Sequence, residues 1–256
     1  SVNVVFTAEQ KIKTSNISNK KFNINAKNII AIASGKGGVG KSTFTVNLAT
    51  ALKVAGNKIG ILDADIYGPN QHLLFDIKEK PSFIKSSEKK LLKPIIKKNI
   101  QFSSVGFLLE EEKAAMWRGP ILSSTIKHLF YSTQWNDLDI LFIDMPPGTG
   151  DAYLTVLKDI NVDDFILVTS NNKLSISDSL KTLTMAEKFN INVLGYIENH
   201  MITASKPNNE NIFNLKKINY LGSVNFDFKI YNFDTNHVSD DIIAISEKIL
   251  STINKI

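Results

Sequence analysis

The stretch "SGKGGVGKST", residues 34–43, contains the residues whose types and spacing most clearly indicate chemistry. The stretch fits the phosphate-loop pattern, because Gly35 is followed, after four residues, by Gly40, Lys41 and Ser42. Consecutive backbone N–H groups of such a loop form an anion nest, and the N-terminus of the next helix adds a partial positive charge. Lys41 would contact the β- and γ-phosphates of a nucleotide, and Ser42 would ligate Mg²⁺. The predicted nucleotide-binding residues here are Gly35, Lys36, Gly37, Gly38, Val39, Gly40, Lys41, Ser42 and Thr43.

Acidic residues follow two further apolar runs, "IGILD" and "LDILFID". Asp63 and Asp65 end the first run, and Asp144 ends the second. Ligands of open α/β sheets collect at the carboxyl ends of strands, so these carboxylates are candidates for the same site. Asp144 would hold the water shell of Mg²⁺. Gly148, after two stiff prolines, could offer its backbone N–H to a γ-phosphate, and Asp151 could cap the following helix.

Apolar runs and helical patterns alternate from "NIIAIAS" onward. This alternation predicts an α/β fold with a mostly parallel sheet and helices on both faces. Residues 1–28 differ, because one apolar run, "VNVVFTA", precedes a polar stretch rich in lysine and asparagine. We expect an N-terminal strand remnant and linker at 1–28 and one P-loop ATPase domain at 29–256. The lysine-rich stretch 78–99 indicates a solvated excursion or hairpin rather than a binding surface.

Composition limits the partners. The chain is 43% hydrophobic and 21% charged, as in ordinary globular proteins, and no apolar run has the length of a membrane span. With no secretory signal pattern, a cytoplasmic location is the default expectation. The net charge of +5 comes from lysines, with Arg118 as the single arginine, which gives little indication of nucleic-acid binding. The absence of cysteine excludes disulfides and cysteine-held zinc or iron–sulfur clusters on these 256 residues.

The stretch "KGGVGKST" resembles the deviant Walker A motif of the MinD, ParA, ArsA and nitrogenase iron-protein ATPases. The resemblance implies ATP and Mg²⁺ as ligands and a homodimer with nucleotide at its interface, in which Lys36 reaches the partner's nucleotide. A second cation there would stabilise charge that develops during phosphoryl transfer. The resemblance also assigns Asp65 to orienting the attacking water, Asp63 to a water-mediated Mg²⁺ contact and Asn199 to adenine. The alternative for Lys36 is that it is only an exposed loop lysine, and the alternative for Asn199 is that it is an ordinary strand-end asparagine.

Three stretches, "LDADIYGPN", "MWRGPIL" and "DMPPGTGDAYLT", resemble the Mrp/ApbC branch of this family, the iron–sulfur cluster carrier ATPases. The resemblance implies slow, dimer-dependent ATP hydrolysis and iron–sulfur assembly or recipient proteins as partners. In the family, members that carry a cluster have a C-x-x-C motif shortly after the asparagine that corresponds to Asn199. Ser205 and Asn208 occupy about those positions here, so the cluster is not expected on this chain. Arg118 is a candidate for a phosphate or partner contact, or for a structural salt bridge.

Two other functions remain open. A MinD/ParA-like positioning switch would use a terminal amphipathic helix on a membrane, and "DDIIAISEKILSTINKI" does have Ile242, Ile245, Ile249 and Ile253 on one face. Its polar side is acidic as well as basic, which favours packing in the core over binding to anionic lipid, so a membrane partner is not expected. A nucleotide-binding scaffold without catalysis is the third possibility, and no residue of the predicted site indicates such decay.

Overall fold

The computed structural model describes residues 24–85, 90–108, 119–200, 213, 217–231, 234 and 236–254. The predicted N-terminal strand, Arg118, Ser205 and Asn208 lie outside the described residues. In chain order the elements are β1 (Ala26–Ala33), α1 (Lys41–Val54), β2 (Ile59–Asp63), α2 (Gln71–Leu74), β3 (Phe83–Lys85), β4 (Lys90–Leu92), β5 (Ile95–Lys97), β6 (Ile100–Ser104), the 3₁₀ turn η1 (Val105–Phe107), α3 (Gly119–Ser132), β7 (Leu138–Asp144), α4 (Asp151–Asp159), β8 (Asp164–Ser170), α5 (Lys173–Lys188), β9 (Asn192–Asn199), β10 (Tyr220–Val224), α7 (Phe228–Tyr231) and α8 (Asp240–Ile253).

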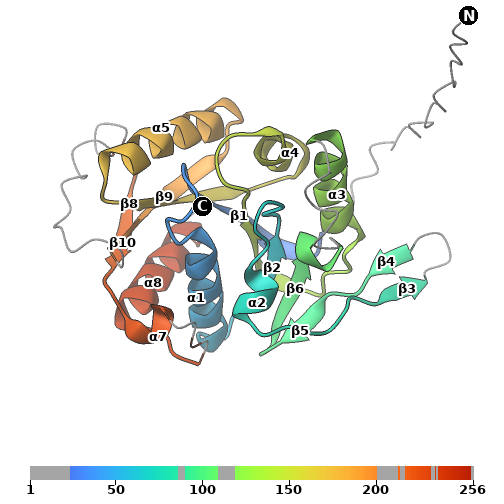
Figure 1. Ribbon diagram of the computed structural model, residues 1–256. Coiled ribbons are helices and arrows are strands. Elements are labelled where there is room, and N and C mark those ends of the chain that lie inside the picture. Colours follow the sequence, from blue (N-terminus) through green and yellow to red (C-terminus); the bar gives the residue numbers. More distant parts are fainter. Residues whose placement is uncertain are drawn as a thin grey trace, which may run out of the picture.

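An eight-stranded sheet forms the centre of the molecule, with the strand order β10-β9-β8-β1-β7-β2-β6-β5 (Figure 1). Every neighbouring pair is parallel except β5 with β6. Helices α3, α4 and α5 cover one face, and α1 and α8 cover the other. The predicted fold class is therefore confirmed. The continuous apolar runs arise because a strand covered on both faces buries all its side chains, as β8 does.

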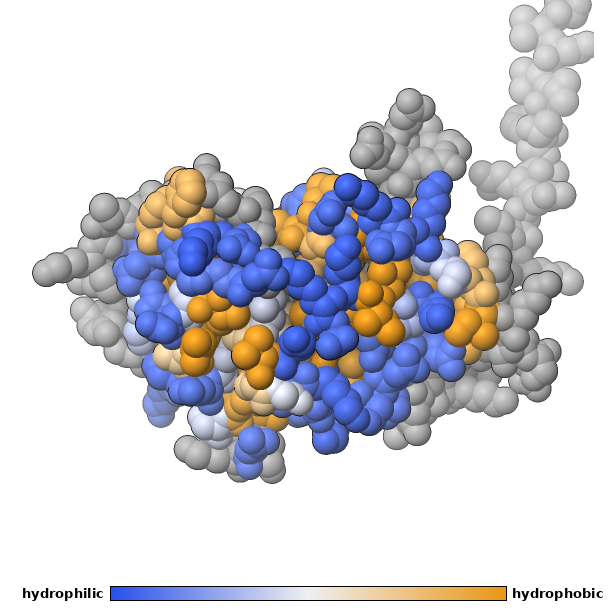
Figure 2. All heavy atoms as spheres, turned by 90° about the horizontal axis from the view of Figure 1, so that it is seen from below, coloured by the Kyte–Doolittle hydropathy of each residue, from blue (hydrophilic) through white to orange (hydrophobic). Residues whose placement is uncertain are grey.

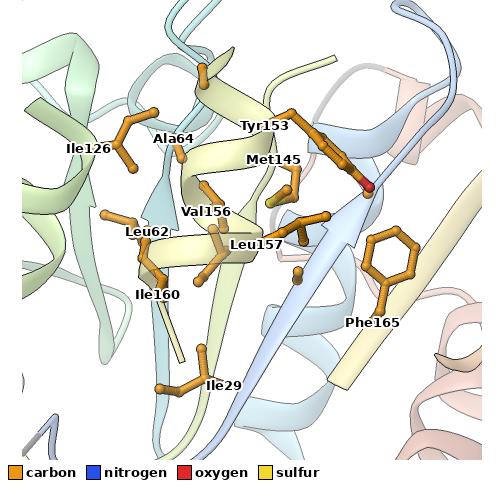
Figure 3. Close-up of a cluster of buried hydrophobic side chains, with 14 of the residues drawn as sticks. Ile29, Leu62, Ala64, Ile126, Met145, Tyr153, Val156, Leu157, Ile160 and Phe165 are labelled. Carbon is orange, nitrogen blue, oxygen red and sulfur yellow. The ribbon is translucent and has the colours of Figure 1, made fainter. Parts of the chain in front are cut away.

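The core beneath α4 shows how this covering works (Figure 3). Tyr153, Val156 and Leu157 of α4 point down onto the sheet, where Ile29 of β1 and Phe165 of β8 lie. All five side chains are less than a tenth exposed. Removing this much apolar surface from water fixes α4 on this face of the sheet, and with it the end of the loop that leads from β7 into the helix.

The order β1-β7-β2 positions the predicted site. Strand β7 lies between β1 and β2, although it follows both in the sequence. In the register of these pairs, Asp144 lies opposite Ile32 of β1 and opposite Asp63 of β2. The backbone N–H of Ala64 donates to the Asp144 carbonyl at 3.0 Å. Two carboxylates that are 81 positions apart in the sequence are thus neighbours at one edge of the sheet, next to the phosphate loop.

The apolar face of α8 lies in the core. Ile242, Ile245 and Ile249 are at most 1% exposed, and Ile253 packs against the same cluster. The helix contacts α1 and β10. Figure 2 shows the molecule from below, the side on which α1 and α8 lie in Figure 1, and this side is mostly hydrophilic with separate hydrophobic areas. The packing prediction is confirmed, and among the described residues no helix combines the length and apolarity that crossing a bilayer requires.

The described residues of 78–99 include an antiparallel strand pair, as predicted for a hairpin between core elements. Strands β3 and β4 pair with each other outside the main sheet, and β5 joins the edge of the main sheet antiparallel to β6. Phe83 and Ile84 of the hairpin are exposed, which fits a segment that projects from the core (Figure 1).

Candidate functional site

The phosphate loop, residues 34–40, connects β1 to α1 as predicted. Gly38 and Gly40 have φ values of 79° and 92°, in the left-handed region where a side chain would be strained. A Cβ placed on Gly38 would meet nothing within 4 Å, and the same is true of Gly148, which follows β7. The loop is therefore an open cradle lined by backbone, as an anion nest requires.

A glycine is required at position 35 for a different structural reason. A Cβ at this position would lie 2.2 Å from the Asp178 carbonyl carbon and 2.3 Å from the Ser179 nitrogen, both in the backbone of α5. Only a glycine lets the start of the loop pack this closely on that helix. Gly35 thus fixes where the loop begins, a role that the sequence motif alone does not reveal.

Lys41 lies in the middle of a carboxylate cluster. Its side chain is 6% exposed, and its Nζ is 2.5 Å from Asp144 Oδ1 and 3.4 Å from both Asp65 Oδ2 and Ser42 Oγ. Burial alone would lower the pKa of Lys41, but the carboxylates of Asp144 and Asp65 outweigh it and raise the pKa above its ordinary value. Among the described residues, the Lys41 ammonium is the one cationic group that forms ion pairs with Asp144 and Asp65.

Asp63 is fully buried and accepts three hydrogen bonds, from the backbone N–H groups of Asp65 and Gln71 and from Ser104 Oγ. Burial, together with the neighbouring Asp144, raises the pKa of Asp63 to about 8, although Lys41 and Ser104 oppose the shift. Burial also raises the pKa of Asp65, against the opposing effect of Lys41. The cluster thus holds more carboxylates than cations at a water-poor position, which is costly unless a further cation joins it.

The donor set fits Mg²⁺. Among the described residues, no three histidine, aspartate or glutamate side chains form a ligand cage for a metal ion. Mg²⁺ does not need such a cage, because it is usually held by one or two carboxylates, water and substrate phosphates. Asp144 and the Ser42 hydroxyl both lie around the Lys41 ammonium, at the edge of the open loop. The excess of negative charge and the oxygen donors suit a divalent cation at this place.

The raised pKa of Asp63 predicts how stability depends on pH without divalent cations. The folded chain binds a proton at Asp63 up to about pH 8, whereas the ordinary pKa of the group is 3.8. Between these values the folded state binds more protons than the unfolded state, so stability falls as the pH rises. In urea denaturation with EDTA, we expect Asp63→Asn to lose less stability than the wild type between pH 5 and pH 8.5. Asp76→Asn, at an exposed position, is the control, and an equal loss in all three proteins would contradict the prediction.

Lys36 and Asn199 differ in their burial and in their contacts with the loop. Lys36 is exposed, and its side chain has no hydrogen bond or ion pair to the part of the chain that the structure describes. Asn199 is 3% exposed at the end of β9, and its Nδ2 donates to the Val39 carbonyl at 2.8 Å. A Cβ on Gly40 would lie 2.5 Å from that nitrogen. Asn199 is therefore more than an ordinary strand-end residue, because it binds the loop main chain.

The predicted helix cap is wrong. The N-cap of α4 is Gly150, and Asp151 is the first helical residue with no side-chain capping bond. The carboxylate of Asp151, in the first turn, still interacts favourably with the positive end of the helix dipole.

Sequence reasoning missed three polar residues of the site. Thr45 Oγ1 donates to the Lys41 carbonyl at 3.0 Å and lies 3.4 Å from Asp144 Oδ1. Ser104, at the end of β6, donates to Asp63, and Gln71 contacts Asp144. The position of Ser104 at a strand end was a usable signal, whereas no pattern in the sequence indicated Gln71.

Comparison with known proteins agrees with this geometry. Residues 25–236 match the family described as "ParA: NUBPL iron-transfer P-loop NTPase". The iron–sulfur cluster carrier protein of Rickettsia felis is 42% identical over 198 residues, which are 77% of this chain and 61% of the relative. The protein of the same name from Pseudomonas fragi is 47% identical over 177 residues, 68% of this chain and 61% of the relative. The chain thus spans about three fifths of the length of these relatives.

Solved structures match over most of the chain. A nucleotide-binding protein from Archaeoglobus fulgidus, solved in complex with ADP, is 31% identical with a TM-score of 0.69, and the match covers 87% of this chain and 89% of that one. The cell-division ATPase MinD of Pyrococcus furiosus has the same TM-score at 20% identity, over 88% and 99% of the two chains, which shows the shared fold. The resemblance to iron–sulfur cluster carrier ATPases is confirmed, and the chain belongs to the family of NUBPL iron-transfer P-loop NTPases.

Proposed function

We propose that this chain binds ATP with Mg²⁺, hydrolyses it as a homodimer with nucleotide at the interface, and acts in iron–sulfur cluster assembly. The proposed ATPase unit is the predicted domain 29–256 together with residues 26–28, which belong to β1 of the same sheet. The observation that carries the proposal is the buried cluster of Lys41 with Asp63, Asp65 and Asp144 directly beside the open glycine loop. Membership in a P-loop NTPase family supports nucleotide use, and the name of the curated relatives supports the cluster-assembly context.

Binding would use the loop and the cluster together. The backbone N–H groups of residues 37–40 would surround the phosphates, and Lys41 would exchange part of its contact with the aspartates for phosphate oxygens. Ser42 and Asp144 would hold Mg²⁺, with Asp63 reaching it through water. Bound Mg²⁺ would supply positive charge to the phosphate oxygens. Gly148 N–H would contact the γ-phosphate, and Asn199 would meet the adenine from its place behind the loop.

Asp65 is suited to orient the attacking water. Its Oδ1 accepts from the backbone N–H groups of Tyr67 and Gly68, each at 3.2 Å, so the carboxylate is fixed while Oδ2 faces Lys41. Because burial raises its pKa, the carboxylate is a better proton acceptor than an ordinary aspartate. Lys36, exposed at the loop, would reach the nucleotide of the second subunit and make hydrolysis depend on dimerisation.

A cluster would need ligands from outside this sequence, since the 256 residues contain no cysteine. We expect anaerobic reconstitution with iron and sulfide, followed by iron and sulfide assays, to leave this chain without a stoichiometric cluster. A stoichiometric cluster on the purified chain would show that other side chains hold it, and would overturn the expectation that this chain has no cluster site of its own.

The nucleotide part is tested by titrating fluorescent ATP and ADP with and without Mg²⁺ and by following phosphate release at several protein concentrations. We expect Mg²⁺-dependent binding, and a turnover per subunit that rises with protein concentration as dimers form. Light scattering with a non-hydrolysable ATP analogue measures the dimer directly. Absence of nucleotide binding would overturn the proposal, and turnover independent of protein concentration would overturn its dimer.

A further inference from the structure

Gln71 connects three parts of the site that are remote in the sequence. It is the first residue of α2 and is fully buried. Its Nε2 donates to Asp144 Oδ2 at 2.7 Å and to the Ser42 carbonyl at 3.2 Å, and its backbone N–H donates to Asp63 Oδ2 at 3.3 Å. One residue thus joins the end of β7, the first turn of α1 and the end of β2.

The chemistry of the partners fixes which way the amide points. An ionised carboxylate and a backbone carbonyl can only accept hydrogen bonds, so the end that contacts Asp144 and Ser42 is the NH₂ group. The Gln71 Oε1 atom is then the opposite end, and it is buried without a hydrogen-bond partner among the described residues. From the covalent size of an amide, this oxygen lies within about 5 Å of Asp144 Oδ2. A buried acceptor without a partner is costly, and this one lies beside the proposed cation site.

We propose that Gln71 is a positioning residue for the divalent cation, an inference that rests on the proposed binding of Mg²⁺ and nucleotide. Its NH₂ group holds Asp144 Oδ2, while Lys41 contacts Oδ1, so both oxygens of that carboxylate are oriented. Its Oε1 is an acceptor for a water molecule of the hydrated Mg²⁺. Partners that orient metal-binding carboxylates in this way typically change metal affinity by 10–100-fold when they are removed.

A purely structural role predicts something different. A buried amide that only joined α2 to the sheet would lower stability when replaced, and binding of nucleotide with and without Mg²⁺ would change together. A positioning role requires that the effect depends on the cation. The Mg²⁺ concentration needed for binding, rather than stability or turnover, is therefore the informative quantity.

Gln71→Met removes the amide at nearly constant volume, and Gln71→Asn keeps an amide but withdraws it by one methylene. Gln101→Met is the matched control. The Gln101 amide also makes two hydrogen bonds, to the backbone of Asn136, but it lies near the amino ends of the strands, away from the site at their carboxyl ends. Fluorescent ADP binding is measured in EDTA and over a Mg²⁺ series, with thermal unfolding as the check of folding. If one Gln71 variant fails to fold, the other is read in the same titration.

We expect both Gln71 variants to need about tenfold more Mg²⁺ for half-maximal enhancement of ADP binding, while the Kd in EDTA changes less than about twofold. Gln101→Met should match the wild type. An unchanged Mg²⁺ requirement in the Gln71 variants, or an equal change in the control, would overturn the inference. The inference would also be overturned if the Kd for ADP in EDTA rose in the Gln71 variants by the same factor as the Mg²⁺ requirement. If the wild type binds ADP without any Mg²⁺ effect, this inference fails while nucleotide binding stands; if it binds no ADP, both proposals fail.

Discussion

Replacing Lys41 by methionine should weaken the binding of ATP and ADP by at least about 100-fold. The reason is that the Lys41 ammonium is the group that offsets the surrounding aspartates, with Asp144 Oδ1 at 2.5 Å and Asp65 Oδ2 at 3.4 Å. Without it, the triphosphate would approach a site of uncompensated negative charge and would also lose a charge-assisted hydrogen bond. Titration of a fluorescent nucleotide in the presence of Mg²⁺ measures the effect.

The control for this substitution is Lys53→Met, in the last turn of the same helix α1. It changes the same residue type and the same net charge far from the loop, so its binding should equal that of the wild type. Circular dichroism is needed for both variants, because Lys41→Met leaves Asp144 without its ion pair. A folded Lys41→Met protein that binds nucleotide within a few-fold of the wild type would contradict the assignment.

Lys36→Ala should leave ATP binding to the monomer within about threefold and lower hydrolysis by about 10³-fold, the effect typical of a transition-state cation supplied by a second subunit. Lys36 is exposed and makes no side-chain hydrogen bond or ion pair within the described part of its own chain. Its removal therefore costs the subunit little in stability. Phosphate release at saturating ATP measures the loss, with Lys188→Ala, exposed in the last turn of α5, as the control.

A mixing experiment separates action on the partner from action on the same subunit. Lys36→Ala and Asp65→Asn proteins should each be inactive, because one lacks the lysine and the other lacks the water-orienting carboxylate. In a mixed dimer, the intact Asp65 of one subunit would meet the intact Lys36 of the other, so activity should return on mixing. No recovery, with dimers shown by light scattering, would place Lys36 in its own subunit's site.

The sequence predicted the parts of the site that depend on local order. The phosphate loop lies between an apolar strand and a helix, so the motif and its context are both contained in residues 26–54. The strands ending in Asp63 and Asp144 are apolar because both their faces are covered. The carboxyl ends of parallel strands share one edge of a sheet, and this is why these two residues were expected at one site.

The parts that could not be predicted depend on contacts between segments remote in the sequence. Gln71 matters only because a one-turn helix places its amide against Asp144, 73 positions later. Gly35 is required by the backbone of α5 at Asp178, and no local pattern specifies that approach. Asp151 was misassigned because the capping position moved by one residue to Gly150, whose backbone is extended. Propensity rules describe such boundaries only to within a residue or two.

The strand order described above has a consequence for biosynthesis. The two neighbours of β1 are β7 and β8, and both follow it by more than a hundred residues. At ribosomal rates of roughly 5–20 residues per second, the apolar strand that carries the phosphate loop must wait several seconds or more for its first partner. During that time it is an unpaired, aggregation-prone edge, and nucleotide cannot yet stabilise it because Asp144 has not been made. The growing chain should therefore depend on chaperone protection until β7 emerges, and ATP binding should mark the end of that dependence.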